Sequence, residues 1–132
     1  MQLAVDVRDA MLNAIETTIG TSPIMKIFVG AVPANCAAAD SGAVLATLSL
    51  PSDWMAASSG GTKIKSGTWE DVSADATGTA GHVRIYTSGN VCKLQGNITA
   101  TGDGGFMTVN NVSFATTQPF VVTAFSLTMP HA

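Results

Sequence analysis

The first twenty residues alternate between apolar and polar positions with the period of an α-helix. Gly20 can close such a helix and Pro23 prevents its continuation. We therefore predict an amphipathic helix over residues 4–19. Its apolar side comprises Ala4, Val5, Met11, Leu12, Ile15 and Ile19, and its polar side comprises Asp6, Asp9, Asn13, Glu16 and Thr17.

After Pro23 the pattern changes to short apolar runs and two-residue alternation, which are typical of β-strands. Breaker residues separate these runs, most clearly in the loop and the glycine-rich turn that we predict over 32–42 and 101–105. The predicted strands are 24–30, 43–51, two short strands within 62–72 that bend at Gly67, a hairpin over 80–100, a pair or one bulged strand over 106–115, and a closing strand over 119–130.

Six to nine short strands with one helix indicate an all-β fold, specifically an antiparallel β-sandwich or jelly-roll-like barrel over residues 24–130. A chain of 132 residues fits one domain, 1–132, because two would each be marginal. The helix is expected to pack on its own domain, since a small sandwich gains core from it. Contact with a neighbouring chain is the alternative.

Charged residues make up 11% of the chain, against roughly 25% in an average soluble protein, and the net charge is −3. The few basic residues are scattered, which argues against nucleic-acid binding. No apolar run is long enough to span a membrane, and the acidic N-terminus does not resemble an export signal. Either Ser, Thr and Asn keep this charge-poor surface soluble, or other chains cover much of it.

Candidate catalytic groups are few. His82 opens a predicted strand and is expected at the surface, and His131 lies next to the last residue. Glu70 and Asp71 are adjacent on a predicted strand and would point to opposite faces, so they are poorly placed as an acid/base couple.

The two cysteines, Cys36 and Cys92, are far apart in sequence. We expect thiols packed as small apolar side chains, with a disulfide as the alternative. The chain has no CxxC or HxxxH spacing and no phosphate-binding glycine motif. We therefore expect no catalytic residue, no metal and no cofactor.

Residues 47–69 place large apolar side chains beside a loop with little charge. Trp54 either plugs the open end of the sandwich or joins Met55 in a contact with another chain. Lys63 and Lys65 share one face of a predicted strand, most simply a solvated edge. The candidate protein-interface residues are Trp54, Met55, Lys63, Lys65 and Trp69.

Four stretches together resemble a family of small tailed-phage and prophage structural proteins. They are DAMLNAIETTIG, LATLSLPSDWMAASSGGTK, SGTW followed by ADATGTAGHVRIY, and TVNNVSFATTQPFVVTAFSLT. The family resembles the head-associated cement, or decoration, proteins of siphophages and podophages. The resemblance implies a non-enzymatic virion protein, made in the bacterial host cytoplasm. On the capsid surface it would bridge subunits of the major capsid protein as a homo-oligomer, a dimer or a trimer.

Two other functions stay open. A tail or receptor-binding component would use loops 51–62 and 100–105 and exposed aromatic side chains to contact a host glycan or protein. A small enzyme on a β scaffold would gather polar groups around His82, Glu70 or Asp71. The aromatic candidates are Trp54, Trp69, Tyr86 and Phe106.

Overall fold

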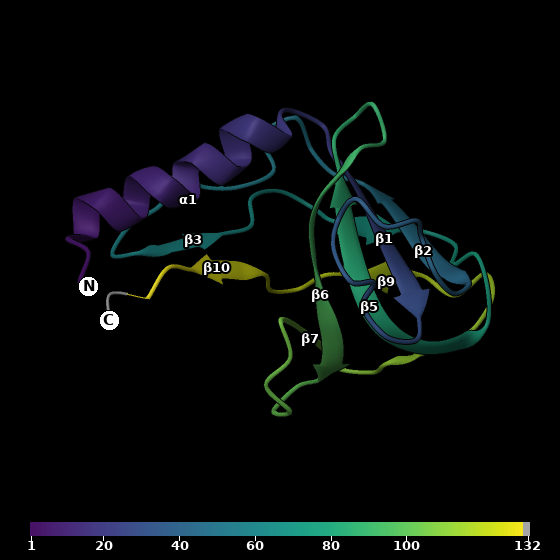
Figure 1. The fold of residues 1–132 in the computed structure, drawn as a ribbon. Helices are drawn as coiled ribbons and strands as arrows, with labels where there is room; N and C mark the ends of the chain where they lie inside the picture. The colour runs from purple at the N-terminus through teal and green to yellow at the C-terminus, as the bar shows by residue number, and fades with distance from the viewer. Residues whose placement is uncertain (131–132) are drawn as a thin grey trace.

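The computed structural model describes residues 1–130, so His131 lies outside the described residues. The described chain is mostly β with one N-terminal helix, as the sequence predicts (Figure 1). The elements are α1 (Val5–Ile19), β1 (Ile24–Val29), β2 (Val44–Ser49), β3 (Thr62–Ile64), β4 (Glu70–Asp71), β5 (Gly78–Tyr86), β6 (Cys92–Ala100), β7 (Met107–Val109), β8 (Ser113–Phe114), β9 (Phe120–Val121) and β10 (Ser126–Thr128).

The local predictions agree with these bounds. The helix begins one residue later than predicted and ends at Gly20, whose N–H donates to the Glu16 carbonyl at 2.9 Å. Gly20 has a φ of 88°, which a glycine adopts without strain. The predicted bend at Gly67 separates β3 from β4, and the predicted hairpin is β5–β6. These features depend on nearby residues, and so the local sequence was sufficient to predict them.

The largest sheet has the strand order β2-β1-β5-β6-β7, and β8 pairs with the start of β5. Two small pairs, β3–β10 and β4–β9, complete the strands. All pairs are antiparallel except β6–β7, which is parallel, so the wholly antiparallel prediction was wrong. The turn at 101–105 connects these two strands, and its Gly102 and Gly104 both have positive φ. The chain turns back after β6 and turns again before β7, so β7 runs beside β6 in the same direction.

The predicted closing strand over 119–130 is in fact two strands with different partners. β9 pairs with β4, and β10 pairs with β3. Val121, expected on the same face as Phe125, is 48% exposed, whereas Val122 and Phe125 are buried. The change of partner rotates the chain between the two strands. It depends on distant residues, which the alternation of this segment does not record.

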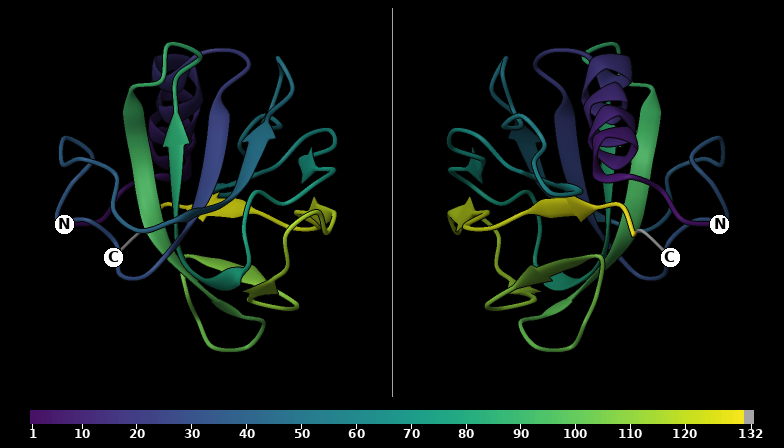
Figure 2. Two further views of the ribbon diagram at one scale, coloured as in Figure 1. Left: turned by 90° about the vertical axis from the view of Figure 1, so that its right-hand side faces the viewer. Right: turned by 90° about the vertical axis from the view of Figure 1, so that its left-hand side faces the viewer.

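The core is a hydrophobic cluster in which the two tryptophans are central. Trp54 and Trp69 are both fully buried, with ring centroids 5.9 Å apart. The Trp54 indole N–H donates to the Gly20 carbonyl at 3.1 Å, so Trp54 ties the end of α1 to the core. Figures 1 and 2 show α1 along one side of the molecule, beside the β3–β10 pair.

Candidate functional site

Four of the five candidate interface residues lie inside the chain. Trp54, Met55, Lys63 and Trp69 are each at most 2% exposed. Lys65 is half-buried, and its Nζ donates to the Gly67 carbonyl at 2.7 Å. The tryptophans fill the core between the small sheets and the end of α1. In this fold, therefore, the predicted set does not form a surface that a partner could contact.

Lys63 contradicts the predicted solvated edge most directly. It lies on β3 beneath α1, because the helix covers the face of β3 that carries it. Its Nζ lies 2.6 Å from the Glu16 carboxylate and donates to the Asn13 side-chain oxygen at 2.8 Å. A buried ammonium is tolerated only when it is paired in this way.

Several polar side chains of α1 bind groups of the domain. The Asp9 carboxylate accepts a hydrogen bond from the Gly61 N–H at 2.8 Å, and Arg8 donates to the Met129 carbonyl at 3.2 Å. Leu12 and Ile19 are the buried apolar residues of the helix. The helix thus packs on its own domain, as expected. It does so through charged side chains as much as through apolar ones.

The outward side of α1 carries apolar as well as polar residues, although a surface helix usually exposes a polar side. Val7 and Met11 are 43% and 42% exposed, and Ala10 and Ala14 are exposed too. Val5 and Met11, predicted on the buried side, therefore lie outside. Among the charged residues of α1 only Asp6 is classed as exposed. A shallow groove of about 270 Å³ adjoins this face and is lined by Met11, Ala14, Ile15, Thr18, Ile19 and Lys93.

A second exposed apolar area lies at the β4–β9 pair. Val121 of β9 pairs with Glu70, and Val72 directly after β4 is 71% exposed. A cavity of about 160 Å³ lies beside β9, between residues 108–114 and 118–123. The four buried residues among the five that the sequence singled out do not expose their side chains at either area, although the Trp69 carbonyl accepts a hydrogen bond from the Val122 N–H at 2.9 Å.

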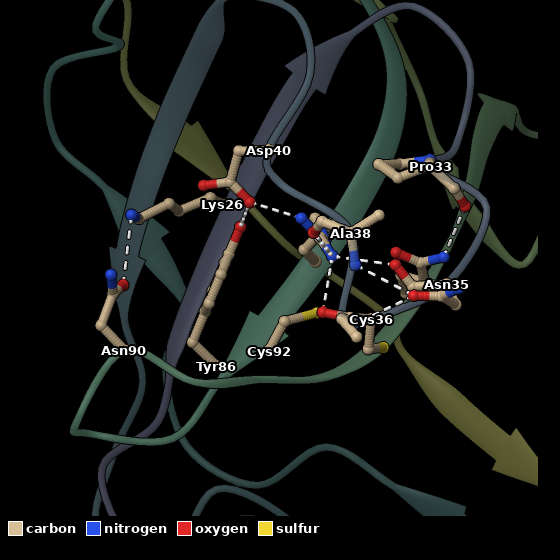
Figure 3. Close-up of polar contacts among 12 residues, drawn as sticks. Lys26, Pro33, Asn35, Cys36, Ala38, Asp40, Tyr86, Asn90 and Cys92 are labelled. Atoms are coloured by element: carbon tan, nitrogen blue, oxygen red, sulfur yellow. Dashed lines mark hydrogen bonds and ion pairs between the residues drawn. The ribbon is translucent and has the colours of Figure 1, made fainter.

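The β1–β2 loop, residues 30–43, covers one face of the main sheet. Arg84 of β5 is 1% exposed and anchors this loop. Figure 3 labels the loop residues that it binds, among them Asp40 and Cys36. Arg84 Nη1 lies 2.5 Å from the Asp40 carboxylate, whose pKa falls below its usual value. Burial alone would raise that pKa, but the hydrogen bond from Tyr86 and the Arg84 guanidinium outweigh it. Arg84 Nη2 donates to the carbonyls of Asn35, Cys36 and Ala38 at 3.0–3.3 Å.

His82 lies under the same loop. It is fully buried, its ring stacks on Phe28 at 4.9 Å, and its Nδ1 lies 2.9 Å from the Gly30 carbonyl oxygen. The predicted surface position was wrong because the loop covers this face of β5. A signal was present in the sequence: fourteen residues between β1 and β2 are too many for a simple hairpin turn, and such a long loop can cover a sheet.

The polar groups considered for catalysis are dispersed. Glu70 is exposed on β4, while Asp71 accepts hydrogen bonds from the N–H groups of Thr47 and Ser73 at 2.9 and 3.0 Å. Within residues 1–130, no group of three or more His, Cys, Asp or Glu side chains could hold a metal ion. The described part of the chain also has no helix long and apolar enough to cross a membrane.

The aromatic candidates for a glycan site are mostly inside. Trp54, Trp69 and Tyr86 are at most 3% exposed, and Phe106 is half-buried against Phe125. The sequence did not reveal the outward face of α1 as a candidate surface. The helical period divides a helix into two sides, but it does not say which side packs against the domain.

No family model, curated protein or solved structure matches this chain.

Proposed function

We propose that this chain is a non-enzymatic cement protein of a tailed-phage virion. It binds the outside of the icosahedral capsid as a dimer or trimer and bridges major capsid subunits. The proposal includes a jelly-roll-like sandwich as the finer description of the β-rich fold. The observation that carries the proposal is the weakly charged outward side of α1: Asp9 and Glu16 bind inward, whereas Val7, Ala10, Met11 and Ala14 are exposed.

An outward face with Asp6 as its one exposed charged residue suits a contact surface. Covering the part around Val7, Ala10, Met11 and Ala14 leaves no ionic group without solvent, which is the main cost of burying charged protein surface. Each Å² of apolar area removed from water contributes about 25 cal/mol. One such contact is weak, but many copies on one lattice bind together with high avidity.

The buried cations Lys63 and Arg84 support the same proposal. Lys63 holds α1 to β3, and Arg84 holds the β1–β2 loop to the main sheet. These ties fix the outer surfaces in place before any partner arrives. A preformed surface loses less entropy on binding than a mobile one.

The test uses purified capsid shells that lack this chain. We expect the purified chain to sediment with the shells, and Met11→Glu to lower the bound amount at least tenfold, because it places a charge at the contact. Val91→Glu, in the β5–β6 turn where Val91 is 53% exposed, is the matched control and should bind as the unaltered chain does. Absence of binding by the unaltered chain, or equal binding by all three proteins, would contradict the proposal.

The alternative, a tail or receptor-binding component, has less support, because three of its four aromatic candidates are buried. Antibody labelling of intact virions separates the two functions. The cement proposal predicts label distributed over the head. Label confined to the tail would favour the alternative.

A further inference from the structure

The β1–β2 loop meets β6 at the two cysteines of the chain. Cys92 opens β6 and lies opposite Tyr86 of β5. Cys36 lies in the loop, and its carbonyl accepts a hydrogen bond from Arg84 at 3.0 Å. Gln95, three residues after Cys92, donates to the Pro33 carbonyl at 2.7 Å. The loop is therefore held against β5 and β6 on either side of Cys36.

The two cysteines are neighbours beneath this loop. Figure 3 shows the Cys92 side chain beside the Cys36 segment of the loop, and the Cys36 thiol acts on the pKa of Cys92. The Cys92 thiol itself donates to the Leu94 carbonyl at 3.7 Å. Both thiols are free and both side chains are partly exposed, so a small reagent can reach them. Their wide separation in sequence hid this pairing, which arises only when the loop folds back over the sheet.

We propose that Cys36 and Cys92 form a reversible disulfide that locks the β1–β2 loop onto the main sheet when the surroundings become oxidising. The proposal does not rest on the proposed function. A disulfide needs the two β-carbons close together, and an exposed loop can adjust to meet that need. Asn35 and Ala37, which flank Cys36, are both exposed.

The chemistry is thiol–disulfide exchange with a small disulfide such as oxidised glutathione. One cysteine thiolate attacks a glutathione sulfur, forms a mixed disulfide and releases one glutathione thiolate. The second cysteine thiolate then attacks the protein-side sulfur and releases the second glutathione. The two cysteines are oxidised, one glutathione disulfide is reduced to two thiols, and the two cysteine protons pass to them.

The reaction is faster above neutral pH. Burial, with the neighbouring Cys36 thiol, raises the pKa of Cys92 to about 11, although the Arg84 guanidinium acts in the opposite direction. Because only the thiolate attacks, little of Cys92 reacts at neutral pH. An equilibrium measurement at about pH 9 shortens this slow step and compares the stability of the link in the folded and the unfolded chain.

The test equilibrates the full chain with glutathione buffers of graded ratio, folded in one series and unfolded in guanidinium in the other. Mass spectrometry of peptides quantifies the Cys36–Cys92 link. We expect an oxidation equilibrium constant at least about 100-fold larger for the folded chain. The oxidised chain should also melt roughly 5–15 °C higher than the reduced chain.

Cys36→Ser and Cys92→Ser are the matched controls. Each should form only a glutathione adduct on the remaining cysteine and show no rise in melting temperature. The proposal is overturned if the folded chain has an equilibrium constant no larger than the unfolded chain. It is also overturned if oxidation yields only glutathione adducts or cross-linked dimers.

Discussion

Arg84 is a buried cation whose partners are mostly main-chain carbonyls of the β1–β2 loop. Arg84→Met would keep much of the side-chain volume but leave those carbonyls without their donor. We expect a loss of about 3–5 kcal/mol in the free energy of unfolding, measured by chemical denaturation. Lys93→Met, at an exposed position on β6, is the control and should change stability by less than about 0.5 kcal/mol.

The Asp40 carboxylate, which lies in the same loop, makes the free energy of unfolding depend on pH. The pKa of Asp40 is lower in the folded chain than in the unfolded chain. At a pH above the unfolded pKa, the ionised carboxylate therefore stabilises the fold in full. This stabilisation is lost as the pH falls through the folded pKa. We expect unfolding free energy to fall more steeply below about pH 4 in the unaltered chain than in Asp40→Asn. Parallel acid profiles for the two proteins would contradict this role.

At the scale of residues, the sequence did not predict which polar side chains are buried. It placed His82 and Lys63 at the surface, and both are buried. The reason is physical: a polar side chain on a strand faces solvent unless a distant segment covers it, and the residue's own neighbours do not encode that segment.

Among the contacts that attach helix α1 to the domain, one is a buried ion pair, Lys63–Glu16. Lys63→Met would leave Asn13 and Glu16 without their cation, though Glu16 can still reach water at its 24% exposed side chain. We expect a loss of about 1–3 kcal/mol and faster hydrogen exchange at α1 amides.

Lys65→Met is the matched control for the helix, since it removes a lysine two residues away that does not contact α1. Its Nζ binds the Gly67 carbonyl and lies 5.8 Å from the Trp69 ring centroid. It should cost less than about 1 kcal/mol and leave α1 exchange unchanged. Equal effects of the two substitutions would show that Lys63 does not hold the helix.

Gly81 sets how closely β1 and β5 approach. The pairing passes from Phe28–His82 to Val29–Ala80, so Gly81 is the extra residue of a β-bulge. A β-carbon there would overlap the main chain of Gly30. We expect Gly81→Ala to cost about 2–3 kcal/mol by denaturation. Gly89→Ala, which has ordinary space around it in the β5–β6 turn, should be nearly neutral, and a similar loss at both positions would refute the argument.

At the scale of elements, the helix, the β5–β6 hairpin and the Gly67 bend were predictable because each is specified locally. The division of 119–130 into β9 and β10, and the inward contacts of the charged residues of α1, were not. Both are decided by which distant surface supplies partners: Glu70 and Lys63 for the strands, and Lys63 and Gly61 for the helix. The residue pattern of a segment limits its possible partners but does not identify the partner that it contacts.

The whole molecule combines ion pairs on the inside with apolar residues on the outside. Charges tie α1 and the β1–β2 loop to the sheets, and Val7, Met11, Val72 and Val121 remain exposed. The five residues predicted as an interface instead mostly build the core or its supports. The candidate site therefore came from the structure, whereas the proposed adhesive function came from the low charge and the family resemblance.

The most direct test of adhesion to a capsid is stoichiometry. Quantitative mass spectrometry of purified virions, with isotope-labelled peptides from this chain and from the major capsid protein, gives the ratio of the two. A protein that clamps shell subunits should be present in numbers comparable to the major capsid protein. A dozen copies or fewer per particle, or none, would contradict it.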